Sequence, residues 1–474
     1  MLRRRPAWAT IVAERMNAND ALSGVWTLGQ LPPDALRHAM LSGADPVLPS
    51  SFAVGTAAQV SIAAAALAAC ELGHARGQIR QDVHVDMLHA ALECVGWFSV
   101  DGRVPEVWDK FSGLYRCADG WVRVHANFAH HRSGALRLLG LTPETAQRAD
   151  AERALEAWRA LDFEQAAADH GLAVAALRRF DEWDVHPQGQ VVAAQPLLTF
   201  ERIGDAPPNP LPGLQPSQRP LSGLRVLDLT RILAGPVCGR TLAAYGADVM
   251  LVNAPYLPNI ESIATTSRGK LSAHIDLRTE NGRRDLNELL ASTHVFVQGY
   301  RPGGLDALGY GSRALAQRKP GLVYVSLSAY GAQGPWRGRR GFDSLVQTAM
   351  GFNHAEAEAA GAADPKPLPM QMLDYATGHL MAFAASAALL RQMNEGGSWH
   401  VRVSLAQTGQ WIRYLGRVPD GFGVARPYRE PYLESTRSGF GDLVAVRHSA
   451  QFSLTPARWT RPSVPPGTDP PTWP

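Results

Sequence analysis

Apolar segments of strand length alternate with segments of helical periodicity in the second half of the chain. Apolar runs occupy residues 224–229 and 248–252, and the segment 237–245 between them has helical spacing. The same alternation continues toward the C-terminus, with strands expected at residues 294–298 and 322–326 and helices at residues 280–292 and 312–318. Strands that alternate with helices predict an α/β fold, a Rossmann-like parallel sheet with helices on both faces.

The first half of the chain has a different pattern. Residues 53–72 are rich in small apolar residues and predict one long helix, and residues 94–107 are rich in turn formers. Residues 120–126 alternate as in an edge strand, and two further helices are expected at residues 148–161 and 164–170. This mixture predicts a smaller α+β domain ahead of the parallel sheet.

A proline-rich stretch at residues 207–220, PPNPLPGLQPSQRP, separates the two patterns. Proline has no backbone N–H and a fixed φ, so this stretch excludes a helix or a central strand and predicts an extended linker. It divides the chain into an N-terminal part, residues 1–206, and a C-terminal part, residues 221–474.

The two parts contain a weak internal repeat. Residues 53–87 and residues 374–405 each read as a small-residue helix, a glycine-containing loop and a short V-x-V strand. Aligned from Ala53 and Asp374, the first copy needs about three extra residues in its loop. Chance can produce two alanine-rich helices, but the shared order of elements favours a repeat, in which the first copy has Ala53 where the second has Asp374.

Composition excludes several classes of protein. Apolar residues make up 46% of the 474 residues and charged residues 19%, so the chain can bury a large core and is not of the disordered class. The net charge of +3 is too small to indicate nucleic-acid binding. Lysines are few, so nearly all positive charge is arginine, whose guanidinium suits phosphate and carboxylate groups.

Cysteine spacing and the longest apolar runs indicate the compartment. The four cysteines show no C-x-x-C spacing, which disfavours a disulfide scaffold and a structural zinc site. The basic N-terminus loses its apolar run at Glu14, which is not typical of a signal peptide, and the apolar run at residues 60–70 is too short to span a bilayer. We expect a cytoplasmic protein with no metal, no membrane contact and no nucleic-acid partner.

The turn TRILAGP at residues 230–236 is the first candidate for ligand binding. It joins a predicted strand to a predicted helix, and backbone N–H groups at a helix start can hold phosphate. The dinucleotide fingerprint G-x-G-x-x-G is absent, and the second strand ends at Asn253 instead of an acidic residue. A strand–helix connection without a ligand is the alternative.

Cationic loops provide further candidates. Lys270 lies beside a glycine just before a strand, and Tyr300 and Arg301 lie in a loop at the carboxyl end of a strand, where open α/β sheets bind ligands. Residues 337–340 form an arginine-rich segment after another such strand. These cations are candidates for phosphate contacts, and ordinary solvated loop charges are the alternative.

Asp374 is the candidate for covalent chemistry. It lies among small and apolar residues at or near the start of a predicted helix. One interpretation is an N-cap, worth about 0.5–2 kcal/mol of helix stability. The other is a carboxylate nucleophile next to the helix dipole.

Several segments, in their order along the chain, resemble family III coenzyme A transferases, the CaiB/BaiF type. The resemblance begins with LSGLRVLDLTRILAGPVCGRTLAAYGADVMLV and continues through VFVQGYRPGGLDALGYG and LDYATGHLMAFAASAALL, in family order over about 190 residues from Leu221. The N-terminal part is similar to the later portion of the same family, through residues 53–87 and FDEWDVHPQGQ at residues 180–190. The chain therefore resembles a late-half copy joined to an early-half copy with a shortened tail.

The resemblance implies an enzyme with a Rossmann-like domain and a small domain, usually in interlocked homodimers. It implies that Asp374 attacks an acyl-CoA thioester to give a mixed anhydride, which CoA thiolate converts into an enzyme-bound thioester. Acyl-CoA and a carboxylic acid are then the substrates, and no cofactor is tightly bound. Because Ala53 cannot act, one catalytic centre per chain is expected, in a homodimer or a pseudo-dimeric monomer. The residues carried over as CoA contacts are Ile232, Leu233, Ala234, Lys270, Tyr300 and Arg340, and Arg301 is added on chemical grounds.

Departures from the family pattern keep alternatives open. The usual glutamate after the second strand is Asn253, a CoA-contacting arginine position is Ala307, and the glycine-rich lid is not evident. A non-catalytic or partner-dependent CoA-binding subunit is one alternative. A 2-methylacyl-CoA racemase or isomerase is less favoured, because Phe342 occupies the position of the racemase histidine. The sequence does not identify the acid.

Overall fold

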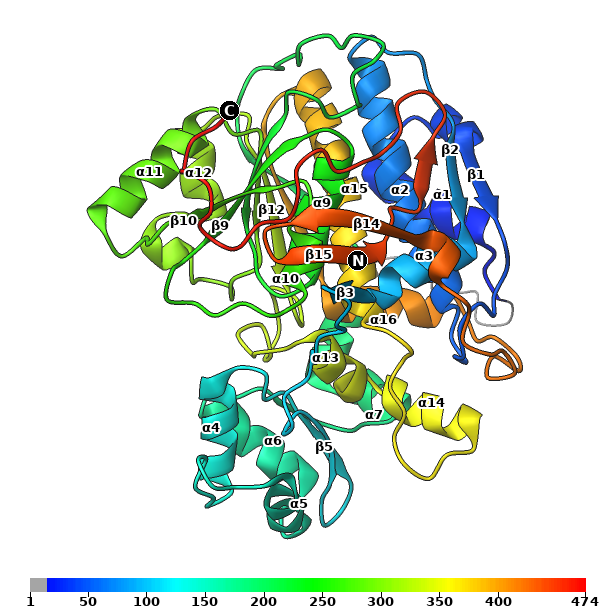
Figure 1. Cartoon of the computed structure of the whole chain (residues 1–474), viewed down its shortest axis with the longest axis vertical. Helices are drawn as coiled ribbons and strands as arrows, with labels where there is room; N and C mark the ends of the chain where they lie inside the picture. Colours follow the sequence, from blue (N-terminus) through cyan, green and yellow to red (C-terminus); the bar gives the residue numbers. More distant parts are fainter. Residues whose placement is uncertain (1–14) are drawn as a thin grey trace, which may run out of the picture.

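The structure is a computed structural model that describes residues 15–474 and consists of a large and a small lobe (Figure 1). The start of the chain, on which the signal-peptide expectation rests, lies outside the described residues. The large lobe is built on a seven-stranded sheet of order β10-β9-β8-β11-β12-β13-β7, parallel except for β7. These strands are β7 (Thr199–Gly204), β8 (Arg225–Leu229), β9 (Asp248–Asn253), β10 (Leu271–His274), β11 (Val295–Gln298), β12 (Val323–Ser328) and β13 (Ser398–Ser404).

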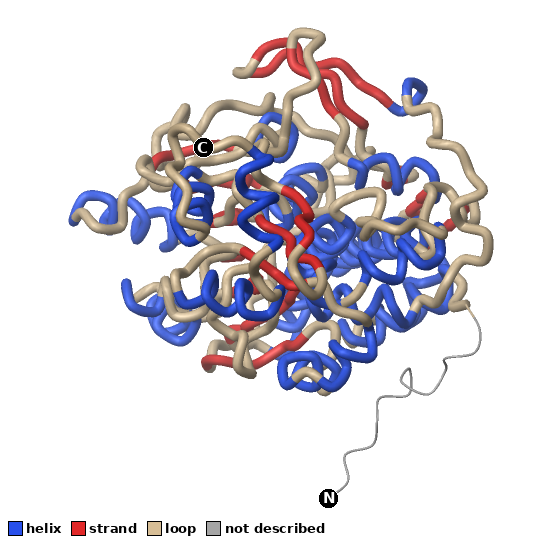
Figure 2. Tube along the Cα trace, turned by 90° about the horizontal axis from the view of Figure 1, so that it is seen from below, coloured by secondary structure: helices blue, strands red, loops and turns tan. Residues whose placement is uncertain are grey.

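Helices cover both faces of this sheet because its central strands are apolar on both sides (Figure 2). Val226 of β8 belongs to the core formed with α9 and α15, whereas the next residue, Leu227, belongs to the core formed with α11 and α12. The covering helices are α9 (Ala234–Ala244), α11 (Glu280–Ala291), α12 (Ser312–Arg318) and α15 (Met372–Glu395). The predicted α/β fold is confirmed.

The small lobe is an α+β unit with its own hydrophobic core. A three-stranded antiparallel sheet packs against helices through residues such as Val122 and Phe163. Its elements are β4 (Gly113–Arg116), β5 (Trp121–Val124), β6 (Val174–Ala176), α4 (Ala129–Leu138), α5 (Arg148–Glu156) and α6 (Ala160–Asp169). The strand expected at residues 120–126 is β5, but it lies between β4 and β6 and is the central strand of this sheet, not an edge strand.

The internal repeat is present without any insertion. Each copy is a helix, a parallel strand and a second helix, namely α2 (Val54–Ala75), β2 (Val83–Asp86) and α3 (Met87–Val95), and α15, β13 and α16 (Leu405–Tyr414). The loop that seemed three residues longer reflects an earlier end of α2 and a later start of β2. The counterpart of Asp374 is consequently Thr56, not Ala53, and the first copy still lacks a carboxylate at this position.

The caps at the helix starts establish this register. Asp45 accepts hydrogen bonds from the N–H groups of Gly55 at 3.0 Å and Thr56 at 2.9 Å, and Asp343 accepts one from the N–H of Asp374 at 2.8 Å. One buried carboxylate therefore holds the first turn of each long helix, at the same position in both copies.

The two copies interlock within one chain. The late strand β7 of the first copy pairs antiparallel with β13 of the second, and β16 (Ala450–Phe452) of the second pairs antiparallel with β2 of the first. Residues 207–220 contain no helix or strand, as expected, but one hydrophobic core extends across both parts. The linker therefore divides the chain in sequence, but the two parts share one core and are not separate in space.

The remaining elements complete the large lobe and the connections. The strand β1 pairs parallel with β2, and the hairpin β14–β15 pairs with β3. The remaining helices and strands are α1 (Ala18–Gly29), η2 (Pro33–His38), β1 (Ala39–Ser42), β3 (Phe98–Val100), α7 (Phe180–Val185), α8 (Pro187–Ala193), α10 (Ile263–Thr266), η3 (Asp306–Leu308), α13 (Asp343–Met350), α14 (Phe352–Ala360), η4 (Glu430–Tyr432), β14 (Leu433–Ser438) and β15 (Gly441–Val446).

The helix α2 is longer than its apolar run at residues 60–70. Among the described residues it is the one helix long and apolar enough to cross a membrane, with a mean hydropathy of 1.4 over the best window. That window is entirely buried in the protein, and α2 packs against α15, α3 and α1. Its apolar character is thus that of a core helix.

A buried ionic cluster joins the two copies. Glu93 of α3 contacts Arg240 of α9 at 3.2 Å, His448 at 3.0 Å and the N–H and hydroxyl of Ser449, both at 2.8 Å. Burial alone would raise the pKa of the Glu93 carboxyl, but His448 and Arg240 outweigh burial and hold this pKa well below its usual value. The cluster ties α3 to α9 and to the C-terminal segment.

We predict that Glu93→Ala lowers the free energy of unfolding by about 3–5 kcal/mol, because Arg240 keeps a buried charge without its carboxylate. Urea denaturation measures the loss. Because the folded pKa of Glu93 is depressed, its contribution is full above the unfolded pKa, about 4.5, and is lost as pH falls through the folded value. The exposed Glu144→Ala is the control, with a change within about 0.5 kcal/mol. Equal effects of the two variants would contradict the prediction.

Candidate functional site

A cavity of about 390 Å³ lies at the carboxyl ends of β8, β11 and β12. Its walls include Ile232 after β8, Tyr300 after β11 and Ser328 at the end of β12. The strand order reverses between β8 and β11, and open α/β sheets bind ligands in the crevice at such a point. We call this space the arginine cavity, since its lining includes Arg231, Arg301, Arg337, Arg339 and Arg340.

The charge of the arginine cavity favours an anion. No Asp or Glu is among the lining residues in the part of the chain that the structure describes. Arg301, Arg337 and Arg340 make no ion pair within residues 15–474. Burial and the nearby Arg301 lower the pKa of Arg340, as expected for guanidinium groups gathered without a counter-ion. Such a cavity suits a phosphate-bearing ligand.

The turn after β8 is strained where it meets the cavity. Ile232 has a φ of 77°, a left-handed conformation that is rare for a β-branched residue. The next residue, Leu233, precedes α9, so the strained turn sets the start of that helix. Strain of this kind persists when the surroundings over-determine it, and it is common where a backbone turn contacts a ligand.

A second cavity, of about 460 Å³, contains Asp374, and we call it the aspartate cavity. Parts of the chain that are distant in sequence line it: among them, the small lobe contributes Arg123 and His125, the turn after β8 contributes Ile232 and Leu233, and α15 contributes Asp374. The two cavities have Ile232 and Phe342 in common as lining residues. One chain therefore brings residues of both copies to a single site.

Asp374 is the third residue of α15 and does not cap it. Its backbone N–H donates to Asp343, while its carboxylate makes no hydrogen bond or ion pair within residues 15–474. Burial, and secondarily the negative charge of Asp343, raise the pKa of Asp374 well above its usual value. Burial also raises the pKa of Asp343, to about 7. The capping interpretation thus applies to Asp343, and the Asp374 carboxylate is left facing the cavity.

An imidazole stacks at the boundary of the two cavities. The ring of His125 lies 3.7 Å from that of Phe342 with the planes 7° apart. Burial, followed by the neighbouring Arg123, lowers the pKa of His125 to about 3, so the ring is neutral near pH 7. Its Nδ1 has no hydrogen-bond partner among the described residues.

Sequence reasoning missed the contribution of the small lobe. Arg123 and His125 lie more than two hundred residues before Asp374, and nothing in local sequence links them to it. The available signal was the alternation W-V-R-V-H, in which Val122 and Val124 face the lobe's core and the polar residues take the other side. Buried polar side chains on one face of a strand indicate a site.

The predicted site residues fall into two groups. Ile232, Tyr300, Arg301 and Arg340 line the arginine cavity, and Leu233 lines the aspartate cavity. Ala234 and Lys270 line neither, which corrects the expectation that both contact a ligand.

The reason in both cases is burial. The carbonyl of Ala234 packs against α15, where a Cβ on Gly378 would lie 2.5 Å from its oxygen. The Lys270 ammonium donates to Asp228 at 2.7 Å and to the carbonyl of Pro236 at 2.8 Å, and its side chain has no exposed surface. Lys270 therefore holds β8 to α9 instead of meeting a ligand.

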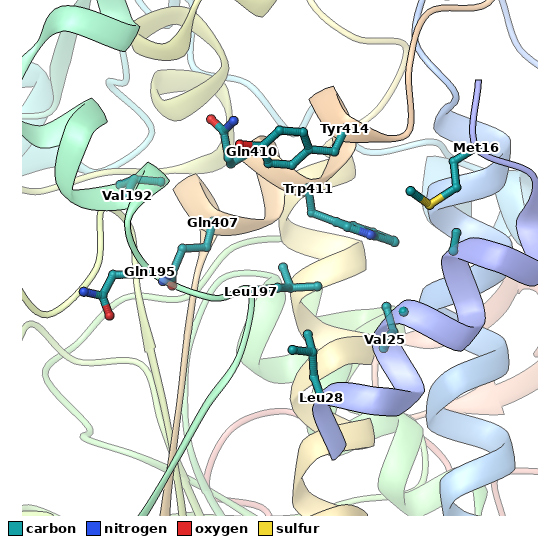
Figure 3. A pocket seen from close by; sticks show the side chains of 12 residues that line it. Met16, Val25, Leu28, Val192, Gln195, Leu197, Gln407, Gln410, Trp411 and Tyr414 are labelled. Atoms are coloured by element: carbon teal, nitrogen blue, oxygen red, sulfur yellow. The ribbon is translucent and has the colours of Figure 1, made fainter. Parts of the chain in front are cut away.

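A third pocket is small, and its described lining has no acidic or basic side chain. It measures about 70 Å³ and lies between α1, α16 and the segment after α8, where Val25, Leu28, Leu197 and Trp411 approach one another (Figure 3). Its lining contains no Asp, Glu, His, Lys or Arg within the described residues.

Comparison with known proteins finds similarity to one family in the C-terminal part of the chain. Residues 221–415 match the model of CoA-transferase family III. A curated protein of Mycobacterium tuberculosis named "Probable fatty acyl-CoA transferase" is 34% identical over 46% of this chain and 59% of its own length. The succinate–glutarate CoA-transferase of Agrobacterium fabrum is 32% identical over 49% of this chain and 64% of its own length. Residues 221–415 are therefore similar to CoA-transferase family III.

Solved structures show partial likeness to the same family. A CAIB/BAIF family protein from Brucella suis is 27% identical with a TM-score of 0.37, and covers 48% of this chain and 65% of its own. A crystal structure of a Mycobacterium tuberculosis protein is 32% identical with a TM-score of 0.36, and covers 42% of this chain and 59% of its own. The chain thus spans roughly six-tenths of the length of these relatives.

We predict that Lys270→Met lowers the free energy of unfolding by about 3–5 kcal/mol, because Asp228 is left buried and unpaired. The double variant Lys270→Met/Asp228→Asn removes both charges and is expected to recover most of this loss. Urea denaturation of the three proteins measures the difference. A fully stable Lys270→Met protein would show that the pair does not hold β8 to α9.

Proposed function

We propose that this protein transfers CoA from an acyl-CoA to a carboxylic acid, with Asp374 as the covalent nucleophile. The observation that carries the proposal is the unpartnered Asp374 carboxylate, in a cavity whose walls are continuous, through Ile232 and Phe342, with an arginine-lined cavity. The names of the matched relatives, which include acyl-CoA and succinate–glutarate transferases, support the reaction class.

The two cavities divide the acyl-CoA between them in this proposal. The phosphates of CoA bind Arg301 and Arg340, and the strained turn at Ile232 directs the pantetheine toward α15. The thioester then meets Asp374 in the aspartate cavity. CoA and the two acids are substrates, and no other cofactor enters the reaction.

In each step of the reaction, one bond to an acyl carbon forms and another breaks. An Asp374 oxygen attacks the thioester carbon, the C–S bond breaks and CoA thiolate leaves an acyl–aspartyl anhydride. The thiolate attacks the aspartyl carbonyl and expels the donor acid as a carboxylate, which leaves an aspartyl thioester. The acceptor carboxylate repeats the sequence in reverse and departs as its CoA thioester.

The environment of Asp374 works against the carboxylate form that the attack needs. The nucleophile must be the carboxylate, yet burial and Asp343 raise its pKa. Asp343 acts as a positioning residue, because it holds the N–H of Asp374 and the start of α15.

The alternatives fit the site less well. A racemase needs two bases at the substrate's α-carbon, and although His125 takes the place beside Phe342, its pKa of about 3 makes it a poor proton acceptor. A partner-dependent subunit needs a wall from another chain, whereas described residues of one chain supply both copies' contributions here. We infer that the N-terminal part completes the site in cis, so a monomer can be active.

A cytoplasmic location is part of the proposal. The four cysteines are buried and unpaired, as expected for a protein of a reducing compartment.

We predict that Asp374→Ala keeps the fold but lowers CoA transfer by at least about 10³-fold, since no other Asp or Glu of residues 15–474 lines the cavity. Mass spectrometry after incubation with an acyl-CoA and hydroxylamine should find a hydroxamate at Asp374 in the wild type and none in the variant. The exposed Asp364→Ala is the matched control and keeps full activity. Transfer by Asp374→Ala at the wild-type rate would overturn the mechanism.

We predict that Arg340→Gln weakens CoA binding about tenfold, since a charge-assisted contact to phosphate is lost. Calorimetric titration with free CoA measures the affinity, which should also fall with salt in the wild type. The exposed Arg137→Gln in the small lobe serves as the control. Equal affinities of wild type and Arg340→Gln would remove Arg340 from the binding site.

A further inference from the structure

Arg123 is a buried guanidinium that the proposed reaction does not use. It lies on β5 of the small lobe, lines the aspartate cavity and is 8% exposed. It makes no hydrogen bond or ion pair within residues 15–474, and its Nε is buried without a partner. The indole of Trp108 lies 5.2 Å from the guanidinium carbon and holds the group against the cavity wall.

Burying a guanidinium without a counter-ion is unfavourable in free energy. Burial lowers the pKa of Arg123 to about 10, against the opposing effect of Asp343, yet the side chain stays charged near pH 7. Buried charges are normally paired, so an unpaired guanidinium in a cavity indicates a site for an anion. Asp343 does not fill this role, because its oxygens accept from the N–H of Asp374 and from Gln347.

The rest of the lining agrees with an anionic occupant. Lys366 and Arg426 also line the aspartate cavity, and Asp374 is the one Asp or Glu among its described lining residues. The phosphates of CoA have their own arginines in the neighbouring cavity. Apolar side chains such as Leu233 and Leu368 line the same cavity and suit a short methylene chain.

We propose that Arg123 binds a second carboxylate of the transferred acid, so that the substrates are short dicarboxylic acids and their CoA monothioesters. This inference rests on the proposed function. One carboxyl of the acid reacts at Asp374, and the other pairs with the Arg123 guanidinium, whose planar fork can donate two hydrogen bonds to a carboxylate. Arg123 thereby selects the acid, and the small lobe is the specificity element of the site.

Isotope exchange tests the proposal with one acid at a time. Glutaryl-CoA is mixed with labelled glutarate, and valeryl-CoA with labelled valerate, which has the same chain length without the second carboxylate. We expect wild-type exchange to favour glutarate by at least about tenfold. Arg123→Gln should lower kcat/KM for glutarate by about 10–100-fold, mainly through KM, and change valerate exchange by at most about threefold.

Control variants separate binding from folding. Arg116→Gln, on the neighbouring strand of the small lobe and exposed, should leave both exchanges unchanged. Arg123→Lys keeps the charge and should restore part of the preference for glutarate without the bidentate contact. Thermal unfolding of each variant verifies that the lobe is intact.

The outcomes distinguish this inference from the function on which it rests. If Arg123→Gln lowers both exchanges equally, Arg123 only stabilises the charges of Asp343 and Asp374. The inference is then overturned, while the proposed transferase function is unaffected. Wild-type exchange of valerate as fast as that of glutarate overturns it as well. If no acid in a panel from formate to hexanoate and oxalate to adipate exchanges, and no hydroxamate forms at Asp374, the proposed function itself fails.

Discussion

The packing of α15 against α2 and α9 is the constraint on which the site depends. Both long helices are buried around almost their whole circumference, and their alanines and glycines allow close approach. At Gly378 even a methyl group would collide with the carbonyl of Ala234 and the side chain of Val237. The start of α15 is therefore fixed against the start of α9, which places Asp374 beside the turn at Ile232.

The carboxylate that holds the start of α15 and the carboxylate that lines the cavity belong to separate residues. A single carboxylate cannot accept the N–H groups of a helix start and also leave its oxygens free for substrate. Asp343 takes the first role, and Asp374 takes the second with both oxygens unpartnered. Burial raises the pKa of both carboxyls, and the negative charge of Asp343 raises that of Asp374 further, while the hydrogen bonds that Asp343 accepts favour its own ionised form.

Sequence reasoning recovered the local elements and failed where long-range packing decides. The strands and helices from Arg225 onward follow from apolar periodicity, because each is stabilised by burial that its own pattern encodes. Lys270, expected at a ligand, is buried against Asp228, whereas Arg123, for which the sequence indicated no role, lines the cavity. A cation's sequence neighbours do not say which partner the fold brings to it. The repeat was placed three residues out of register, because alanine-rich helices match at several offsets, and the caps at Asp45 and Asp343 decide between them.

The interlocking of the copies explains why one chain has one site. The start of α2 corresponds to the start of α15, but Thr56 replaces the reactive carboxylate, and its hydroxyl donates to Asp45 at 2.7 Å. The space in front of α2 is filled by Phe52 against Phe180 of α7 and Phe352 of α14, with ring centroids 4.9–5.9 Å apart. The same strand exchange that buries this inactive start brings the small lobe across to α15. The small lobe and the turn after β8 therefore meet at the start of α15, the copy that has Asp374, and line one cavity with it.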